Sequence, residues 1–325
     1  MNPTLPTVAL VYDFDGTLAP GNMQEFGLLQ ALGYDNPNDF WNICDQLAKT
    51  NDAGGIAVVM YAIQAAAQRA GLQCTRAFLR EYGKSVQFFP GVMQWFENIN
   101  TYAAQIGIDV KHYINSSGIK EMIEGCAIAK AFERIYACSY LYDSQGDACW
   151  PAVVVDYTKK TQFLYKINKG IREVSDHVRI NEFVPSNQRP VPFERMIYFG
   201  DGETDVPCMR TIKSNGGHSF AVYGNEKKTR LSATTVGGRT RKFCMCSRLH
   251  RRWRNDGNRQ AYLGQDKSRL YPIPTRSRKS RYAEYVYGIG GFLRINPSCE
   301  SNAEGMLAQT ELQAKSIGSS IQKEH

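Results

Sequence analysis

The chain of 325 residues has a formal net charge of +8, and 43% of its residues are hydrophobic. This composition excludes a wholly unfolded chain and is sufficient for one or two globular domains with a sizeable core. No apolar run is long enough for a membrane-spanning helix, and the first residues do not resemble a secretion signal. We therefore expect a cytoplasmic protein without a membrane partner.

The first predicted element is a strand at residues 8–12, an apolar run without polar alternation. This pattern is typical of a central parallel strand that is covered on both faces. The strand leads directly into Asp13, Asp15 and Gly16. Side chains two residues apart on an extended segment point the same way, so the two acids repel each other unless a metal, a proton or a phosphoryl group lies between them. An Asp-rich turn and helix cap is the structural alternative, but the arrangement favours chemistry.

The following elements predict an α/β fold with a Rossmann-like parallel sheet. Apolar residues at three- and four-residue spacings indicate helices from about 22 to 84. We interpret residues 21–85 as a helical cap inserted into an α/β core of residues 1–20 and 86–228. The core continues with a helix after Pro90, a strand at 106–114, a helix at 119–132, strand-like segments at 136–142 and 152–157, a helix at 159–171 and a strand at 196–199.

Polar residues gather where these later elements begin or end. The second strand runs into Asn115-Ser116-Ser117-Gly118, and Lys159 and Lys160 open a helix. A cation at the start of a helix is slightly unfavourable with the helix dipole, which favours a functional role for one of the two lysines. The last strand runs into an acidic loop at 200–205.

The four segments resemble, in order, the motifs of the haloacid dehalogenase superfamily. They read DFDGT, NSSG, KKT and GDGETD, and the resemblance covers about residues 6–223. It implies a phosphatase, that is, a phosphoric monoester hydrolase, which uses Mg²⁺ and removes phosphate from a small phosphorylated metabolite through an aspartyl-phosphate intermediate. The place of the insert is similar to the cap of one large branch of the superfamily. Phosphonatase and phosphomutase activities stay open as alternatives.

Within this resemblance each acid has an expected role. Asp13 is expected to attack phosphorus, and Asp15 to act as general acid and base. Asp13, Asp15 and Asp201 are expected to bind Mg²⁺, with Asp205 supporting the metal site.

The phosphoryl oxygens are expected to be bound by a hydroxyl and a lysine. Ser116 and Ser117 are both candidates, with Ser116 preferred because of its place at the strand end. Of Lys159 and Lys160, we prefer Lys160.

Several other residues are interpreted as structural. The aromatic residues of the insert are expected in the core of the cap rather than in a substrate pocket, the lone histidines are expected to be structural or solvated, and two further lysines of helix 159–171 are expected to be solvated. These residues are Phe40, Trp41, Tyr61, His112, His177, Lys166 and Lys169.

The positive charge lies in the last part of the chain. Residues 1–228 contain 21 Lys and Arg against 24 Asp and Glu, whereas residues 229–325 contain 18 against 7. One interpretation of residues 229–325 is a basic arm that binds nucleic acid, attached to a degenerate phosphatase body. The preferred interpretation is a shift of reading frame near Lys228, because another frame can encode the acidic, helix-forming segments that the superfamily has here. The tail would then be irregular, would require no nucleic-acid partner and would impair the activity.

Overall fold

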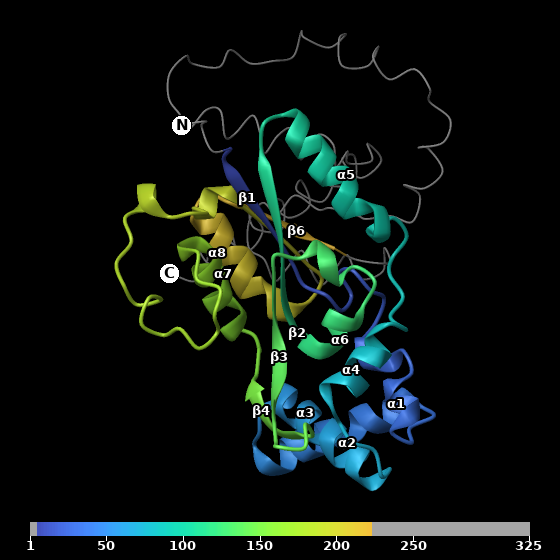
Figure 1. Ribbon diagram of the computed structural model, residues 1–325. Helices are drawn as coiled ribbons and strands as arrows, with labels where there is room; N and C mark the ends of the chain where they lie inside the picture. Colours follow the sequence, from blue (N-terminus) through green and yellow to red (C-terminus); the bar gives the residue numbers. More distant parts are fainter. Residues whose placement is uncertain (1–4, 223–325) are drawn as a thin grey trace, which may run out of the picture. The chain divides into compact units, whose positions relative to one another are not determined.

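The computed structural model of the chain describes residues 5–222 (Figure 1). The predictions for residues 229–325, whether a basic arm or the product of a frame shift, lie outside the described residues. Within residues 5–222, no helix is both long and apolar enough to cross a membrane.

A mostly parallel sheet forms the centre of the described part of the chain. Its six strands lie in the order β4-β3-β2-β1-β5-β6, and every neighbouring pair is parallel except β3 and β4. The predicted α/β class is thereby confirmed, and the sequence prediction omitted β6. The strands are β1 (Thr7–Tyr12), β2 (Asp109–Ile119), β3 (Arg134–Tyr142), β4 (Ala148–Val153), β5 (Met196–Gly200) and β6 (His218–Ala221).

Helices cover both faces of the sheet and form most of the insert. In Figure 1, α5 lies on one side of the sheet and α7 and α8 lie on the other, while α1, α2 and α3 gather at the end where β4 lies. The helices are α1 (Leu28–Ala31), α2 (Pro37–Asn51), α3 (Gly55–Arg69), α4 (Arg76–Gly83), α5 (Val92–Gln105), α6 (Lys120–Gly125), α7 (Lys159–Lys169) and α8 (Val206–Ser214), with 3₁₀ turns that include η1 (Met23–Glu25), η2 (Ala129–Ala131) and η5 (Glu203–Asp205).

Local sequence explains where the insert helices begin. The side chain of Asn36 accepts a hydrogen bond from the Asn38 N–H at 3.1 Å, and Pro37 occupies the first turn of α2. The hydroxyl of Thr75 accepts one from the Phe78 N–H at 3.1 Å and so caps α4. Such caps satisfy backbone donors that a helix start leaves unpaired.

Two glycines let α4 and α6 approach closely. A Cβ atom placed on Gly83 would lie 2.0 Å from the carbonyl oxygen of Met122, and one on Gly125 would lie 2.0 Å from that of Arg80. The helix expected at 119–132 is shorter than predicted, since α6 ends at Gly125 and the turn η2 follows. The last helix of the insert therefore packs backbone to backbone against a helix of the core.

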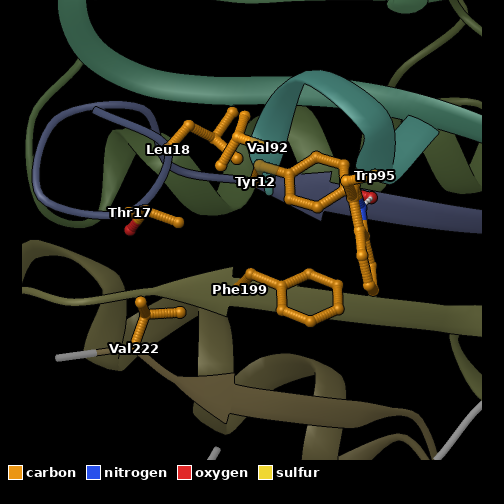
Figure 2. Close-up of a pocket in the computed structure, with 7 residues that line it drawn as sticks. All are labelled: Tyr12, Thr17, Leu18, Val92, Trp95, Phe199 and Val222. Atoms are coloured by element: carbon orange, nitrogen blue, oxygen red, sulfur yellow. Dashed lines mark hydrogen bonds between the residues drawn. The ribbon is translucent and has the colours of Figure 1, made fainter. Parts of the chain in front are cut away.

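The first strand lies in the middle of the core. Val8 to Tyr12 are all buried, as expected for a central strand covered on both faces. The rings of Tyr12 and Phe199 stack at 5.0 Å between centroids, and the indole of Trp95 donates to the Tyr12 hydroxyl at 2.8 Å. These rings, with Thr17, Leu18, Val92 and Val222, line a cavity of about 10 Å³ (Figure 2). At most one water fits such a space, so we interpret it as a packing gap.

His112 on β2 is a buried structural residue. Its Nδ1 lies 3.0 Å from the Tyr12 hydroxyl and its Nε2 lies 2.9 Å from Asn100 Oδ1. Burial lowers the pKa of His112 to about 4.

The lowered pKa of His112 predicts a loss of stability in acid. The pKa is about 4 in the folded protein and about 6.5 in an unfolded chain, so this contribution is complete above pH 6.5 and is lost as the pH falls to 4. It amounts to about 3 kcal/mol. The free energy of unfolding of the wild type should therefore fall more steeply between pH 6.5 and 4 than that of His112→Gln, as measured by urea unfolding. Parallel pH profiles would contradict this expectation.

The prediction that Lys166 is solvated is wrong. Lys166 is buried, and its ammonium donates to the carbonyl oxygens of Glu173 and Asp176 at 2.9 and 2.8 Å. Lys169, one turn further along α7, donates to two carbonyls later in the same loop. Both lysines thus hold the segment that follows α7, a long-range contact that helical spacing does not reveal.

Candidate active site

The strand register brings three of the predicted segments to one edge of the sheet. Tyr12 is paired with Ile114 on β2 and with Phe199 on β5. Asp13 follows the first of these residues, and the serine and acidic segments follow the other two. The chain passes from β1 to β2 on one side and returns to β5 on the other. Ligands of open α/β sheets bind where the strand order reverses in this way.

Lys160 connects two of the acids. Its ammonium lies 3.1 Å from Asp13 Oδ1 and 2.7 Å from Asp205 Oδ1, and it is fully buried. The side chain of Lys159, by contrast, is 53% exposed, and its ammonium lies 3.3 Å from Asp156 Oδ2. The first turn of α7 therefore directs Lys160, and not its neighbour, into the site.

Asp205 is held firmly by its surroundings. Besides Lys160, it accepts hydrogen bonds from the Tyr198 hydroxyl at 2.7 Å and from the Gly202 N–H at 3.1 Å. Both carboxylate oxygens are thus engaged. This arrangement suits a residue that orients the acidic loop and Lys160, rather than one whose oxygens are free to bind a metal ion.

Asp201 lies against the first loop. Its Oδ1 accepts a hydrogen bond from the Thr17 hydroxyl at 3.4 Å. Gly16 has φ +74°, and a Cβ there would lie 2.1 Å from Asp201 Oδ2. One ligand oxygen each from Asp13, Asp201 and Asp205 lie within 4.8 Å of one another. Only a glycine at position 16 leaves room for this approach.

The charges of Asp13, Asp201 and Asp205 favour the binding of a cation. Burial, and then the charge of Asp205, raise the pKa of Asp13 to about 7. The Asp201 side chain is exposed on one side, but enclosure of its carboxylate, followed by the charge of Asp205, raises its pKa to about 6. Burial opposes the charge of Lys160, yet the two carboxylates outweigh this effect and raise its pKa. One lysine shared among three acids leaves negative charge uncompensated, and oxygen ligands of this kind fit Mg²⁺.

Asp15 faces the cap side of the site. Its Oδ1 accepts a hydrogen bond from the Met23 N–H at 2.9 Å. Burial and the charge of Asp13 raise the pKa of Asp15 well above its usual value. A raised pKa favours the protonated carboxyl group, and a protonated carboxyl group can donate a proton, as a general acid must.

Both predicted serines line the same space. The Ser116 Oγ accepts a hydrogen bond from the Gly118 N–H at 3.0 Å, which leaves its own O–H free to donate. The buried Ser117 Oγ has no hydrogen-bond partner in the part of the chain that the structure describes. The amide of Asn115 donates to the carbonyl of Lys160 at 2.9 Å and so joins β2 to the start of α7. The sequence prediction assigned no role to Asn115.

A cavity of about 240 Å³ lies over these groups. The core contributes mostly polar residues to the wall of the cavity, and the insert contributes mostly apolar ones. The core residues are Asp13, Asp15, Ser116, Ser117, Gly118, Ile119, Lys160, Asp201, Gly202 and Thr204, and the residues of the insert are Asn22, Gln24, Trp41, Ile56, Val59 and Met60.

Sequence reasoning placed three insert aromatics in the core of the cap, and the structure separates them. Phe40 is buried as expected, but Tyr61 is 57% exposed and Trp41 lines the cavity. The Trp41 indole donates to Glu25 Oε1 at 2.9 Å. The position of Trp41 in the helical pattern does not by itself distinguish a core residue from a residue that lines a cavity.

Replacing Gly16 by alanine should damage the site. The positive φ disfavours alanine, and its Cβ would displace the Asp201 carboxylate. We expect a loss of about 1–3 kcal/mol in the free energy of unfolding and at least about a tenfold loss in kcat/KM for a phosphomonoester. Gly33→Ala is the matched control, since Gly33 has φ +88° with no atom within 4 Å of the added Cβ. Equal losses of activity in both variants would refute the role of the Asp201 contact.

The family comparison agrees with this geometry. The family model described as "Putative Phosphatase" matches residues 8–222. The chain belongs to this Putative Phosphatase family. Membership confirms the prediction of a phosphatase-type enzyme in general terms.

The chain is also similar to a protein of another organism and to several solved structures. The chain is 29% identical over 261 residues to an uncharacterized protein of Borreliella burgdorferi, a match that covers 71% of this chain and 88% of the relative. It is 16% identical to a HAD-family hydrolase of Salmonella enterica serovar Typhi, with a TM-score of 0.45 and coverage of 71% and 67%. It is 11% identical to a probable phosphoserine phosphatase of Vibrio cholerae, with a TM-score of 0.46 and coverage of 71% and 59%.

Proposed function

We propose that this member of the family is a Mg²⁺-dependent phosphohydrolase that acts on a small phosphorylated metabolite through an aspartyl phosphate on Asp13. The observation that carries the proposal is the place of Asp13. Asp13 directly follows the central strand and lines the cavity. Its carboxylate lies 3.1 Å from the ammonium of the buried Lys160.

The metal is assigned to two of the three acids whose oxygens lie together. Asp13 and Asp201 would bind Mg²⁺ directly, and the Asp15 carbonyl is proposed as a further ligand. Asp205, whose oxygens are already hydrogen bonded, would hold the acidic loop and Lys160 in position. Bound Mg²⁺ would offset the repulsion between the attacking carboxylate and the phosphoryl oxygens.

The residues of the chain divide the first chemical step among them. A carboxylate oxygen of Asp13 forms a bond to phosphorus while the bond from phosphorus to the ester oxygen breaks. Asp15 donates its proton to that departing oxygen. Ser116, Ser117 and Lys160 donate hydrogen bonds to the phosphoryl oxygens, whose charge spreads in the transition state.

The second step returns the enzyme to its starting state. Asp15, now a carboxylate, accepts a proton from a water molecule as that water attacks phosphorus. The bond between phosphorus and Asp13 breaks, which releases phosphate and restores both carboxyl groups. The raised pKa of Asp15 supports both its donation and its later acceptance of a proton.

Release of phosphate from a panel of phosphomonoesters tests the proposal. We expect turnover with Mg²⁺ and its loss with a chelator, together with a phosphorylated peptide that contains Asp13 after acid quenching during turnover. Turnover that a chelator leaves unchanged would overturn the metal assignment. A phosphoryl group found on a residue other than Asp13 would overturn the assignment of the nucleophile.

A further inference from the structure

The wall of the cavity opposite the acids lacks free positive charge. It consists of Trp41 on α2 and of Ile56, Val59 and Met60 on α3. Among the described residues that line the cavity, Lys160 is the one cation, and Asp13 and Asp205 already hold it. A carboxylate or a second phosphate on the substrate would therefore lose water without gaining a partner there.

Two polar residues of the insert, Asn22 and Gln24, also line the cavity. Asn22 is exposed, whereas Gln24 is buried. It lies in the turn η1, is only 4% exposed and lines the cavity. Its Oε1 is buried and has no hydrogen-bond partner among residues 5–222. Buried acceptors are almost always hydrogen bonded, so this oxygen is suited to a donor that enters the cavity.

We propose that Gln24 determines substrate specificity by accepting a hydrogen bond from an O–H or N–H group of the departing alcohol, and that this alcohol carries no negative charge and is largely apolar. The proposal rests on the proposed phosphohydrolase activity, which supplies the phosphoester at the acidic end of the cavity. The apolar wall receives the body of the alcohol, and Gln24 selects one polar group on it. Pockets built in this way reject an analogue without the donor, because the buried acceptor then stays unpaired.

Three phosphomonoesters of equal chain length separate the two parts of this proposal. Propane-1,2-diol 1-phosphate carries an apolar end and a hydroxyl, propyl phosphate lacks the hydroxyl, and 3-phosphoglycerate has a carboxylate in place of the methyl group. We expect kcat/KM for the diol ester to exceed that of each of the other two by at least about tenfold, the effect of one well-placed hydrogen bond. A preference for 3-phosphoglycerate would overturn the proposal.

Two variants assign the preference to residues. Gln24→Met keeps the size of the side chain. It should lower kcat/KM for the diol ester to the value for propyl phosphate, and it should change kcat/KM for propyl phosphate by no more than about threefold from the wild type. Gln30→Met, at an exposed position of α1, is the control and should change neither rate. Val59→Lys adds a cation to the half-buried wall and should raise the relative rate for 3-phosphoglycerate by at least about fivefold. A preference for the diol ester that persists in Gln24→Met would overturn the assignment to Gln24.

A binding measurement distinguishes failure of this inference from failure of the proposed function. Calorimetric dissociation constants of the three esters are measured for Asp13→Asn, with and without Gln24→Met, so that no turnover is needed. Tighter binding of the diol ester that depends on Gln24 supports the inference even if the wild type hydrolyses none of the three. Hydrolysis of all three esters with equal dissociation constants leaves the phosphatase intact and overturns the inference.

Discussion

Asp13→Asn is expected to reduce kcat for phosphate release by at least about a thousandfold, the scale of loss when a covalent nucleophile is removed. The amide keeps the shape of the side chain but is a poor nucleophile and a weak ligand for Mg²⁺. Folding should be preserved, because Lys160 retains its 2.7 Å contact with Asp205. Steady-state release of phosphate measures the first effect, and the midpoint of thermal unfolding checks the second.

A matched variant controls for the loss of one negative charge. Asp35→Asn makes the same chemical change at an exposed position of the insert and should leave kcat within about twofold. Activity of Asp13→Asn close to that of Asp35→Asn would exclude Asp13 as the nucleophile.

Lys160→Met is expected to lower the free energy of unfolding by about 3–5 kcal/mol, since it leaves buried carboxylates without their cation. Asp13 and Asp205 both lie within hydrogen-bond distance of the ammonium, and Lys160 is fully buried. We expect kcat for phosphate release to fall as well, because the same ammonium is proposed to bind the phosphoryl oxygens. Urea unfolding in the absence of metal and steady-state kinetics measure the two effects separately.

The neighbouring lysine provides the control on the same helix turn. Lys159 is 53% exposed and its ammonium lies 3.3 Å from Asp156, so Lys159→Met should cost at most about 1 kcal/mol. Equal destabilisation by the two substitutions would show that loss of a helix-start lysine, rather than loss of the buried pairing, explains the effect.

The central strand and the position of the site could be predicted, because residues close together in the sequence indicate both. An apolar strand that ends in Asp13 and Asp15 indicates both the central strand and the edge where ligands bind. The order of the motifs then brought Asp201 and the serines to the same edge. The prediction preferred Lys160 to Lys159 only weakly, since adjacent helical residues point about 100° apart and the packing of α7 decides which one is buried.

The errors concern contacts between distant segments. Lys166 was expected to be solvated, but its ammonium reaches carbonyls on the loop after α7. Trp41 and Gln24 line the cavity because of how the insert packs over the core, and no periodicity in the sequence reports this packing. The short strand β6 has only four residues, too few for a pattern of alternation to identify it.

The close approach of α4 and α6 sets a boundary for movement of the insert. At Gly83 and Gly125 each helix backbone fills the space that a side chain would need on the other, so neither helix can slide or roll without collision. The helix α4 is thus fixed to the core although it belongs to the inserted sequence. The segment between α3 and α4 is fixed as well, because the N–H of Ala148 on β4 donates to the carbonyl of Cys74 at 3.1 Å. We therefore expect α4 and this segment to keep their place on the core while substrate enters the cavity.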